Sequence, residues 1–292
     1  MNNTSPILVT GASGSTGSAI VRALTARRAP VRAMVRRPPS EGTFPAEVET
    51  VVADFDDQES MAAALAGVSR AYLVTPSSEQ AQEQQVRFVD QAVRSGVQRL
   101  VVLSQLGAEL TSPVRFLHYH AAVEQHIRSL DIDYTFLRPN LFFQGLLAFA
   151  GPVTEQHRFF APIGTATVSA IDVRDIAEVA AVTLTDHGHH RVTYTLTGPA
   201  AITHAEMADA LSAALGRAIT FHDAPPEAFA AALQGVLPPW QVDGLLEDYA
   251  HYRRGEATPV STAVTDVTGI PPRDISQFAR DYADRFRARG GL

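Results

Sequence analysis

Short runs of apolar residues alternate along the first two-thirds of the chain with segments whose apolar residues recur every three or four positions. The short runs predict buried β-strands, and the spaced segments predict helices with one apolar face. The predicted strands cover residues 7–9, 30–37, 48–53, 70–76, 99–104, 132–140 and 192–198. This rhythm predicts an α/β fold with a doubly wound parallel sheet, whose ligands bind outside the carboxyl ends of the strands.

The alternation loosens after Gly151, where polar loops, proline-rich stretches and short helical patterns replace it. We therefore predict a sheet domain formed by residues 1–150 and 166–199. A smaller carboxyl-terminal lobe, residues 151–165 and 200–292, is predicted to cover the ligand-binding rim of the sheet and to supply the walls of a substrate pocket.

The first predicted strand runs into a loop that has glycine at every third position, and a helical pattern follows. Gly11 suits a sharp turn, Gly14 lets the main chain approach a diphosphate, and Gly17 lets the helix pack closely. Free amides at the helix start and the positive end of its dipole form an anion site there without any lysine. The alternative is a loop rich in Gly and Ser that only turns the chain.

The end of the second predicted strand lies about twenty residues past these glycines, where a dinucleotide fold contacts the adenine ribose. An acidic residue there would accept hydrogen bonds from a free 2′-hydroxyl, but this chain has Arg36 and Arg37. A guanidinium fork suits a 2′-phosphate instead. We therefore predict NADP(H) as the cofactor, with Arg36 as its stronger partner. The alternative is that both arginines only solubilise a strand end.

Polar residues follow the third predicted strand at the same rim. Asp54 is predicted to bond the exocyclic amine of the adenine, and Phe55 to flank its ring. The alternative makes Asp56 or Asp57 the cap of the helical segment 59–65. Both interpretations can hold together, on different residues.

The pattern of residues 116–130 predicts a helix whose apolar stripe includes a histidine. His120 falls on this stripe and so faces inward, whereas His118 lies on another face. Residues two positions apart cannot chelate one metal from a regular helix. His120 is a candidate catalytic residue, and the alternative is a core histidine with one satisfied nitrogen.

Further candidates follow the fifth and sixth predicted strands, again at the rim. Ser104 and Pro139 are predicted to contact the cofactor, Gln105 is predicted to contact the substrate, and Asn140 is a candidate catalytic residue. Phe142 and Phe143 come next and are predicted, with Gln105, to line a pocket for a flat substrate. Ordinary core packing is the alternative for the two phenylalanines.

Composition narrows the class of protein. The chain has 292 residues, 46% of them hydrophobic and 19% charged, as in ordinary soluble globular proteins. It contains no cysteine, which excludes disulfides and thiolate metal sites, and its net charge of −7 argues against a nucleic-acid surface. No apolar run is long enough to span a bilayer and no signal-peptide pattern is present, so a cytoplasmic location is expected. His187, His189 and His190 are expected to form a solvated turn around Gly188, and no metal site is predicted.

Several motifs together resemble the NmrA-like branch of the atypical short-chain dehydrogenase/reductases. They are the glycine loop from Val9 to Gly17, Arg36, Asp54, the spacing of His120 and Glu124, residues 134–140 and residues 172–177. The sequence Arg-Arg-Gly-Glu-Ala at 253–257 is similar to the triphenylmethane reductase and type 2 quinone oxidoreductase subgroup.

This resemblance implies a Rossmann domain that binds NADPH, with Ser13 and Thr16 at the diphosphate and with Thr75 and Pro76 near the nicotinamide ribose. The complete set of loop residues expected at the cofactor is Gly11, Ser13, Gly14, Ser15, Thr16 and Gly17. Ordinary short-chain reductases use a tyrosine and a lysine four residues later. Here Phe116 and His120 are expected in those places, which removes the usual phenolic proton donor.

A reductase without that tyrosine suits acceptors whose reduced form is a weak base. Hydride reduction of an isolated ketone gives an alkoxide with a pKa near that of water, about 15.7, whereas a quinone gives a phenolate with a pKa of roughly 10. The difference is about 8 kcal/mol of stabilisation, as an upper bound, that the enzyme need not supply.

We therefore predict an NADPH-dependent reductase of a quinone-like or polycyclic aromatic substrate, which includes conjugated aromatic ketones. His120 would orient the substrate oxygen or relay a proton, and Asn140 would hold the carboxamide or the substrate. The alternative is an NADP(H)-binding redox sensor without turnover. No nucleic-acid or membrane partner is expected, and a homodimer is left open.

Overall fold

The computed structural model describes residues 5–287, and packing divides the chain into two units. The first unit comprises Met1–Ser112, Leu117–Arg138 and Val173–Thr195. The second comprises Pro113–Phe116, Pro139–Asp172 and Leu196–Leu292. The predicted domain boundaries at residues 150, 165 and 199 stay a prediction, because packing alone does not tell which segments fold independently.

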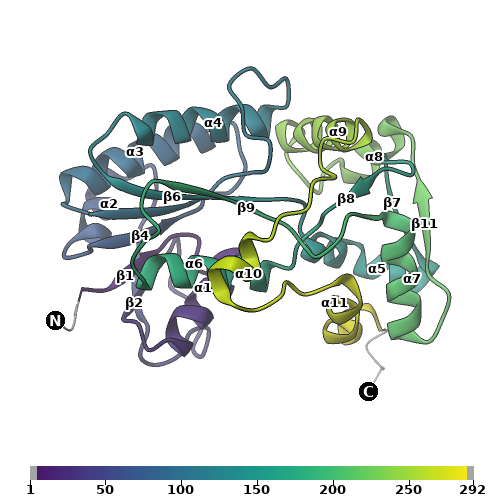
Figure 1. The fold of residues 1–292 in the computed structure, drawn as a ribbon, viewed down its shortest axis with the longest axis horizontal. Helices are drawn as coiled ribbons and strands as arrows, with labels where there is room; N and C mark the ends of the chain where they lie inside the picture. Colours follow the sequence, from purple (N-terminus) through teal and green to yellow (C-terminus); the bar gives the residue numbers. More distant parts are fainter. Residues whose placement is uncertain (1–4, 288–292) are drawn as a thin grey trace. The chain divides into compact units, whose positions relative to one another are not determined.

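The first unit is built around a seven-stranded sheet with the order β3-β2-β1-β4-β5-β6-β9 (Figure 1). Neighbouring strands from β3 to β6 pair in parallel. The strands are β1 Ile7–Val9, β2 Val31–Val35, β3 Glu49–Val52, β4 Arg70–Leu73, β5 Arg99–Leu103, β6 Asp133–Pro139 and β9 Val192–Leu196. Every strand predicted from the apolar runs is present, so the predicted α/β fold with a doubly wound sheet is confirmed.

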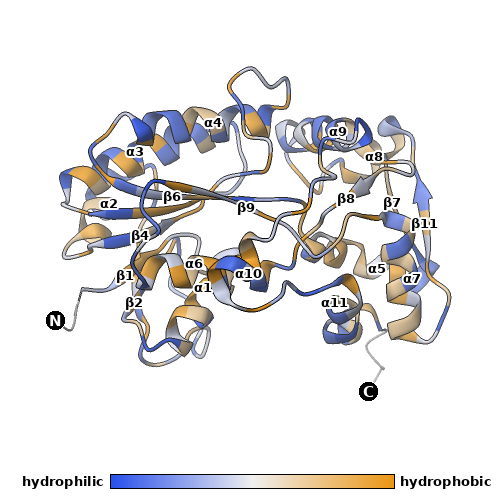
Figure 2. Cartoon of the chain, viewed as in Figure 1, coloured by the Kyte–Doolittle hydropathy of each residue, from blue (hydrophilic) through white to orange (hydrophobic). Residues whose placement is uncertain are grey.

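Helices cover both faces of this sheet. α2, α3 and α4 lie on one face, whereas α1 and α6 pack against each other on the opposite face (Figure 1). Their bounds are α1 Ser15–Ala26, α2 Gln58–Leu65, α3 Ala81–Arg94, α4 Arg115–Arg128 and α6 Val173–Thr185. Figure 2 shows hydrophilic and hydrophobic residues side by side on α3 and α4, as expected for helices that bury one face only.

Burial of the strands explains the apolar runs of the sequence. β5 is buried along its whole length, whereas the edge strand β3 is largely exposed. A parallel sheet covered on both faces needs continuous apolar strands, because neither face meets water. Leu8, Phe88, Leu100 and Phe136 belong to the resulting core between the sheet and α2, α3 and α4.

The second unit packs short helices and two small sheets around an aromatic core that includes Phe143, Phe159 and Phe278. β10 pairs with β8 in antiparallel, and β11 pairs with β7 in parallel. Its strands are β7 Arg158–Ala161, β8 Thr167–Val168, β10 Ile202–Thr203 and β11 Thr220–Asp223. Its helices are η1 Phe143–Phe149, α5 Ala150–Gln156, α7 His204–Leu215, α8 Pro226–Leu233, α9 Pro239–Arg253, α10 Ala263–Thr268, α11 Ile275–Asp281 and η2 Ala283–Phe286.

Two of these helices begin at a proline inside the proline-rich stretches of the sequence. α8 starts at Pro226 and α9 at Pro239. Proline is favoured at the first helical position because its missing N–H would have no helical acceptor there anyway. Among the helices of residues 5–287, none has both the length and the apolar character needed to cross a membrane.

His204, the first residue of α7, is buried in the aromatic core of the second unit with only 3% of its surface exposed. Its ring lies 5.3 Å from the ring of Phe221 and 6.1 Å from that of Tyr249. Within residues 5–287 its Nδ1 has no hydrogen-bond partner. Burial lowers the pKa of His204 to about 4, so the imidazole is neutral at neutral pH.

We predict that the free energy of unfolding decreases as the pH falls from about 6.5 towards 4. The unfolded chain binds a proton on His204 near pH 6.5, but the folded protein does not until about pH 4, so protonation favours the unfolded state. The His204 contribution reaches at most about 3 kcal/mol. Urea unfolding measured across this range should show a shallower decline for His204→Phe, whereas the exposed His222→Gln variant should keep the wild-type slope.

Candidate functional site

The glycine loop begins where two hydrogen bonds join the ends of β1 and β4. Thr10 Oγ1 donates a hydrogen bond to the Val74 carbonyl oxygen at 2.8 Å and accepts one from the Val74 amide at 2.8 Å. Gly11 follows with a φ of +57°, a left-handed conformation that glycine adopts without strain. The loop is therefore fixed between two strand ends, with Ser13 and Ser15 exposed on it.

Gly17 allows α1 to start directly against this loop. A Cβ atom on Gly17 would lie 2.2 Å from the carbonyl oxygen of Gly11, much closer than any side chain can approach. Gly14 is the N-cap of α1 and offers no side chain to the first helical amides. Those N–H groups therefore stay available to an anion, while the neighbouring Thr16 is buried.

Arg36 lies one residue beyond β2 and is exposed, as is Arg37. Neither guanidinium has a hydrogen bond or an ion pair within the part of the chain that the structure describes. Because β1 and β2 pair in parallel, with Val9 opposite Ala33, their carboxyl ends lie at the same edge of the sheet. Arg36 thus offers an unused fork of donors at the edge that carries the glycine loop.

In the segment after β3, some side chains are exposed at the edge of the sheet and others are buried in the core. Asp54 is exposed, and its Oδ1 accepts a hydrogen bond from the Asp56 amide at 3.0 Å. Phe55 is buried against Phe88, with ring centroids 5.8 Å apart, so its ring is part of the core. Asp57 caps α2 by accepting hydrogen bonds from two amides of its first turn, which confirms the capping interpretation for that residue. The adenine contacts of Asp54 and Phe55 stay predictions.

Thr75, just after β4, is held by a residue of α3 that no motif of the sequence indicates. The Gln85 side chain on α3 donates from Nε2 to Thr75 Oγ1 at 2.8 Å, and both residues are buried. With that lone pair filled, the Thr75 hydroxyl hydrogen is free to donate elsewhere. Pro76 is exposed beside it. A nicotinamide ribose contact at Thr75 and Pro76 stays a prediction.

A buried carboxylate lies between α4 and the ends of β5 and β6. Glu124 Oε1 accepts from Ser104 Oγ at 2.6 Å and from Arg138 Nε at 2.8 Å. Its Oε2 accepts from Arg138 Nη2 at 2.6 Å and from Arg128 Nη2 at 2.8 Å. Burial acts to raise the pKa of Glu124, but the hydrogen bonds and positive charges around it outweigh that effect and hold the pKa below its usual value. Glu124 is therefore a structural anion, and Ser104 donates to it.

His120 lies one helical turn before Glu124 and is 9% exposed. Burial lowers its pKa to about 3, with Arg138 adding to this and Glu124 opposing it. The imidazole is therefore neutral at neutral pH, and no hydrogen bond joins it to another of the residues 5–287. Such a ring has one N–H donor and one nitrogen acceptor available.

Tyr119 places a phenol beside this histidine. Its ring centroid lies 4.1 Å from that of His120, and its hydroxyl lies 3.4 Å from Ser77 Oγ in the segment that follows β4. The motif spacing instead places Phe116 at the position of the tyrosine of ordinary short-chain reductases. Phe116 is buried against Trp240 and Gly244, where a Cβ on the glycine would lie 2.3 Å from the phenyl ring.

Asn140 uses all of its amide atoms inside the second unit. Its Nδ2 donates to Ser169 Oγ and to the Ala257 carbonyl oxygen, each at 2.8 Å, and its Oδ1 accepts from the Leu141 amide at 2.8 Å. This geometry makes Asn140 a tie between segments, and its predicted contact with the carboxamide or substrate is untested. Pro139 before it is buried.

The predicted substrate-binding residues differ in exposure. Phe143 is 2% exposed and packs against Phe278 at 5.7 Å, as the core alternative predicts. Phe142 and Gln105 are half-buried. Contact of these three residues with a substrate stays a prediction, and only Phe142 and Gln105 retain exposed surface to offer one.

A family model described as the NmrA-like family matches residues 3–266. The chain belongs to this family. The match confirms the resemblance drawn from the glycine loop, Arg36, the His120–Glu124 spacing and the later motifs.

Among residues 5–287 no group of three or more His, Asp or Glu side chains is placed to hold a metal ion.

Relatives of this NmrA-like protein match almost its whole length. It is 34% identical over 284 residues to the NAD(P)H azoreductase of Xenophilus azovorans, covering 97% of this chain and 99% of that protein. The NADPH complex of an NADPH-dependent quinone oxidoreductase from Escherichia coli superposes with a TM-score of 0.84, at 26% identity over 94% of this chain and 99% of that chain. The NADP(H) complex of the Citrobacter triphenylmethane reductase gives a TM-score of 0.82, at 26% identity over 95% and 99%.

Two buried polar residues of this NmrA-like protein, Gln85 and Tyr119, join the candidate site only in the structure. A sequence signal exists for each. Gln85 lies one turn before Val89 on the inward face of α3, and a polar residue there is unusual unless it is paired. Tyr119 adjoins the histidine that the helical pattern turns inward. Neither signal identifies the partner, because Thr75 and Ser77 belong to a different element.

We predict that Glu124→Ala lowers the free energy of unfolding by about 3 kcal/mol, because it removes a buried carboxylate and leaves the half-buried guanidinium of Arg138 without its partner. Urea or thermal unfolding measures the loss. A matched control is Glu83→Ala on α3, which removes an exposed partner of Arg87 at 3.5 Å and should change the stability by less than about 0.5 kcal/mol. Equal effects of the two substitutions would contradict a structural role for the Glu124 cluster.

Proposed function

We propose that this NmrA-like protein is an NADPH-dependent reductase that transfers hydride to a flat, conjugated small-molecule acceptor such as a quinone. It is an NAD(P)H-dependent oxidoreductase, in keeping with its reductase relatives. The observation that carries the proposal is the open anion cradle at the start of α1, together with the unpaired Arg36 guanidinium at the same edge of the sheet.

The residues of this edge fit NADPH. The first-turn amides of α1 would receive the diphosphate, because Gly14 provides no capping side chain to compete with it. Arg36 would pair with the 2′-phosphate as a bidentate donor. Thr75, whose hydroxyl oxygen already accepts a hydrogen bond from Gln85, would donate towards the nicotinamide ribose. The coenzyme, when bound, supplies the hydride from its nicotinamide ring.

The acceptor class follows from how little acid catalysis the buried groups offer. Phe116 cannot donate a proton, and His120 is neutral, so no charged acid is available on this face of α4. Acceptors that form a stabilised anion need the least help, as phenolates do relative to alkoxides. The azo, quinone and triphenylmethane groups in the names of the relatives are all conjugated, which supports this choice.

His120 and Tyr119 are the proposed proton-handling residues. The neutral imidazole can hold a substrate oxygen or nitrogen through its N–H, and it has no competing hydrogen bond to any of the described residues. The Tyr119 hydroxyl keeps a proton at the end of β4, close to Ser77. A group that holds and passes a proton in this way contributes to turnover while leaving coenzyme binding unchanged.

The proposal is tested by following NADPH oxidation with a panel of quinones, azo dyes, triphenylmethane dyes and aromatic ketones. We expect turnover with at least one class, and a decrease of at least about tenfold in kcat for His120→Ala with unchanged NADPH affinity. Unchanged turnover of His120→Ala at saturating NADPH would refute the role of the histidine. Tight NADPH binding with no oxidation by any acceptor would instead identify a redox sensor.

We further predict that Arg36→Ala weakens NADPH binding by about 10- to 100-fold and leaves NADH binding unchanged, because only NADPH carries the 2′-phosphate. Titration of coenzyme fluorescence gives both dissociation constants. Arg37→Ala is the matched control, since Arg37 is equally exposed one residue further on. Equal affinities of the wild-type protein for NADPH and NADH would refute the assignment of Arg36.

A further inference from the structure

A second concentration of positive charge lies at the opposite end of the sheet from the glycine loop. Arg70 and Arg99 are the first residues of β4 and β5 and are direct neighbours in the parallel register. A cavity of about 160 Å³ opens beside them. Its lining residues are Ser69, Arg70, Gln98, Arg99, Asp133, Thr185 and His187.

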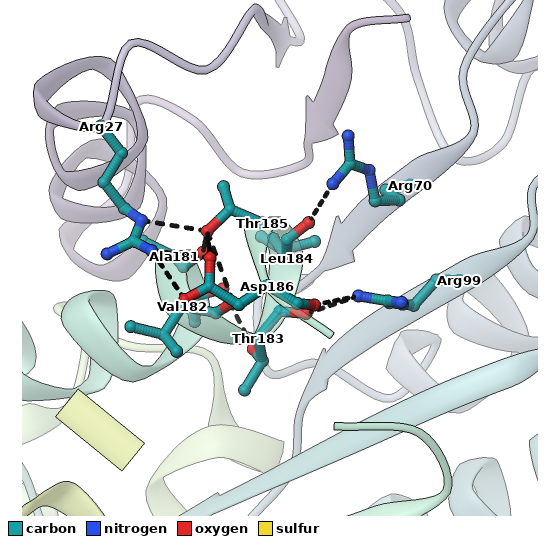
Figure 3. Close-up of polar contacts among 10 residues, drawn as sticks. Arg27, Arg70, Arg99, Ala181, Val182, Thr183, Leu184, Thr185 and Asp186 are labelled. Atoms are coloured by element: carbon teal, nitrogen blue, oxygen red, sulfur yellow. Dashed lines mark hydrogen bonds and ion pairs between the residues drawn. The ribbon is translucent and has the colours of Figure 1, made fainter. Parts of the chain in front are cut away.

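Hydrogen bonds to the end of α6 hold both guanidinium groups in place (Figure 3). Arg70 Nη1 donates to the Leu184 carbonyl oxygen at 2.7 Å. Arg99 Nη1 donates to the carbonyl oxygens of Thr183 at 3.1 Å and Asp186 at 2.8 Å. These bonds cap the helix and complement its dipole, but a carbonyl oxygen does not neutralise a full positive charge.

The two cations have no ion pair with any carboxylate of the described residues. Asp186 makes its ion pair with Arg27 at 2.8 Å instead, as Figure 3 shows. Asp133, the acidic residue of the cavity lining, pairs with His190 at 3.2 Å and lies 3.9 Å from Arg191. Neither guanidinium therefore has a carboxylate in direct contact, although Arg99 Nη2 lies 3.3 Å from Nε2 of His190, whose Nδ1 is the atom that contacts Asp133.

The electrostatic consequence is visible in both side chains. Burial lowers the pKa of Arg70. Burial and then the charge of Arg70 lower the pKa of Arg99, and Asp133 offsets this only in part. Like charges held side by side without a carboxylate in direct contact create a positive potential, which favours an anion in the adjacent cavity.

Unused hydrogen-bond donors belong to the same lining. Ser69 Oγ and Arg70 Nε are both buried, and neither has a hydrogen-bond partner within residues 5–287. Buried donors are normally satisfied by protein or by a bound group. The lining therefore combines two guanidinium groups with an unsatisfied Ser69 hydroxyl, and its acidic residue, Asp133, already bonds to His190.

We propose that this cavity binds a tetrahedral oxyanion: inorganic phosphate or the phosphate group of a phosphomonoester. Its volume of about 160 Å³ is large enough to hold one phosphate group. A tetrahedral anion can accept from Arg70, Arg99 and Ser69 through separate oxygens, whereas a carboxylate has only two oxygens to share among them. The bound anion would tie the amino ends of β4 and β5 to the end of α6.

The test is thermal unfolding in increasing inorganic phosphate at constant ionic strength, with NADP⁺ present at saturation to occupy the Arg36 site. We expect a saturable rise of Tm with phosphate that chloride does not reproduce. The dissociation constant should rise about tenfold in Arg70→Lys, which keeps the charge but loses the fork, and about threefold in Ser69→Ala. Arg94→Lys, an exposed arginine of α3 outside the cavity, is the matched control and should behave as wild type.

Glycerol phosphate distinguishes the two sources, because a site open to monoesters should respond to it as well as to inorganic phosphate. Arg36→Ala should keep the full phosphate response, so failure of the coenzyme site and failure of this site can be told apart. The proposal is overturned if phosphate gives no saturable rise, if Arg70→Lys and Ser69→Ala both respond as the wild type does, or if acetate binds as tightly as phosphate.

Discussion

The close approach of α1 to the main chain of the glycine loop is the constraint on which the proposed coenzyme site depends. This site lies at the carboxyl ends of the parallel strands. Gly17 leaves no room for a Cβ beside the Gly11 carbonyl oxygen, so the helix begins where the loop ends. This contact aims the first-turn amides of α1 at the edge of the sheet. Arg36 contributes its charge at the same edge because β2 pairs in parallel with β1. The proposed phosphate site is therefore formed by backbone geometry, with one side chain added.

Electrostatics inside the first unit gives different charge states to two ionisable groups that lie one helical turn apart. Glu124 stays ionised because Arg138, Arg128 and Ser104 supply donors to both of its oxygens. His120 stays neutral because it is buried without such partners. The same helix thus carries a fixed structural anion and an uncharged ring that can hydrogen-bond a ligand. Burial alone would neutralise both groups, and the two arginines and Ser104 around Glu124 make them differ.

The two ends of the parallel sheet use positive charge differently. At the carboxyl ends, Arg36 is exposed and unpaired, next to helix amides that suit a phosphate. At the amino ends, Arg70 and Arg99 each donate hydrogen bonds to the last carbonyl oxygens of α6. A parallel sheet brings residues of equal register together at each end, so two arginines that begin neighbouring strands become neighbours in space. The charge pair is thus a direct result of strand topology.

The sequence by itself determined the alternating fold, the glycine loop and the arginine at the end of β2, because these depend on local pattern and on spacing along one βαβ unit. It also placed His120 on the inward face of α4. Only the tertiary structure decided that Phe55 and Phe143 belong to cores, that Asn140 bonds to Ser169 and Ala257, and that Gln85 holds Thr75. Those outcomes depend on partners far away in the sequence, which periodicity cannot identify, because it reports which face a residue occupies and not what lies opposite.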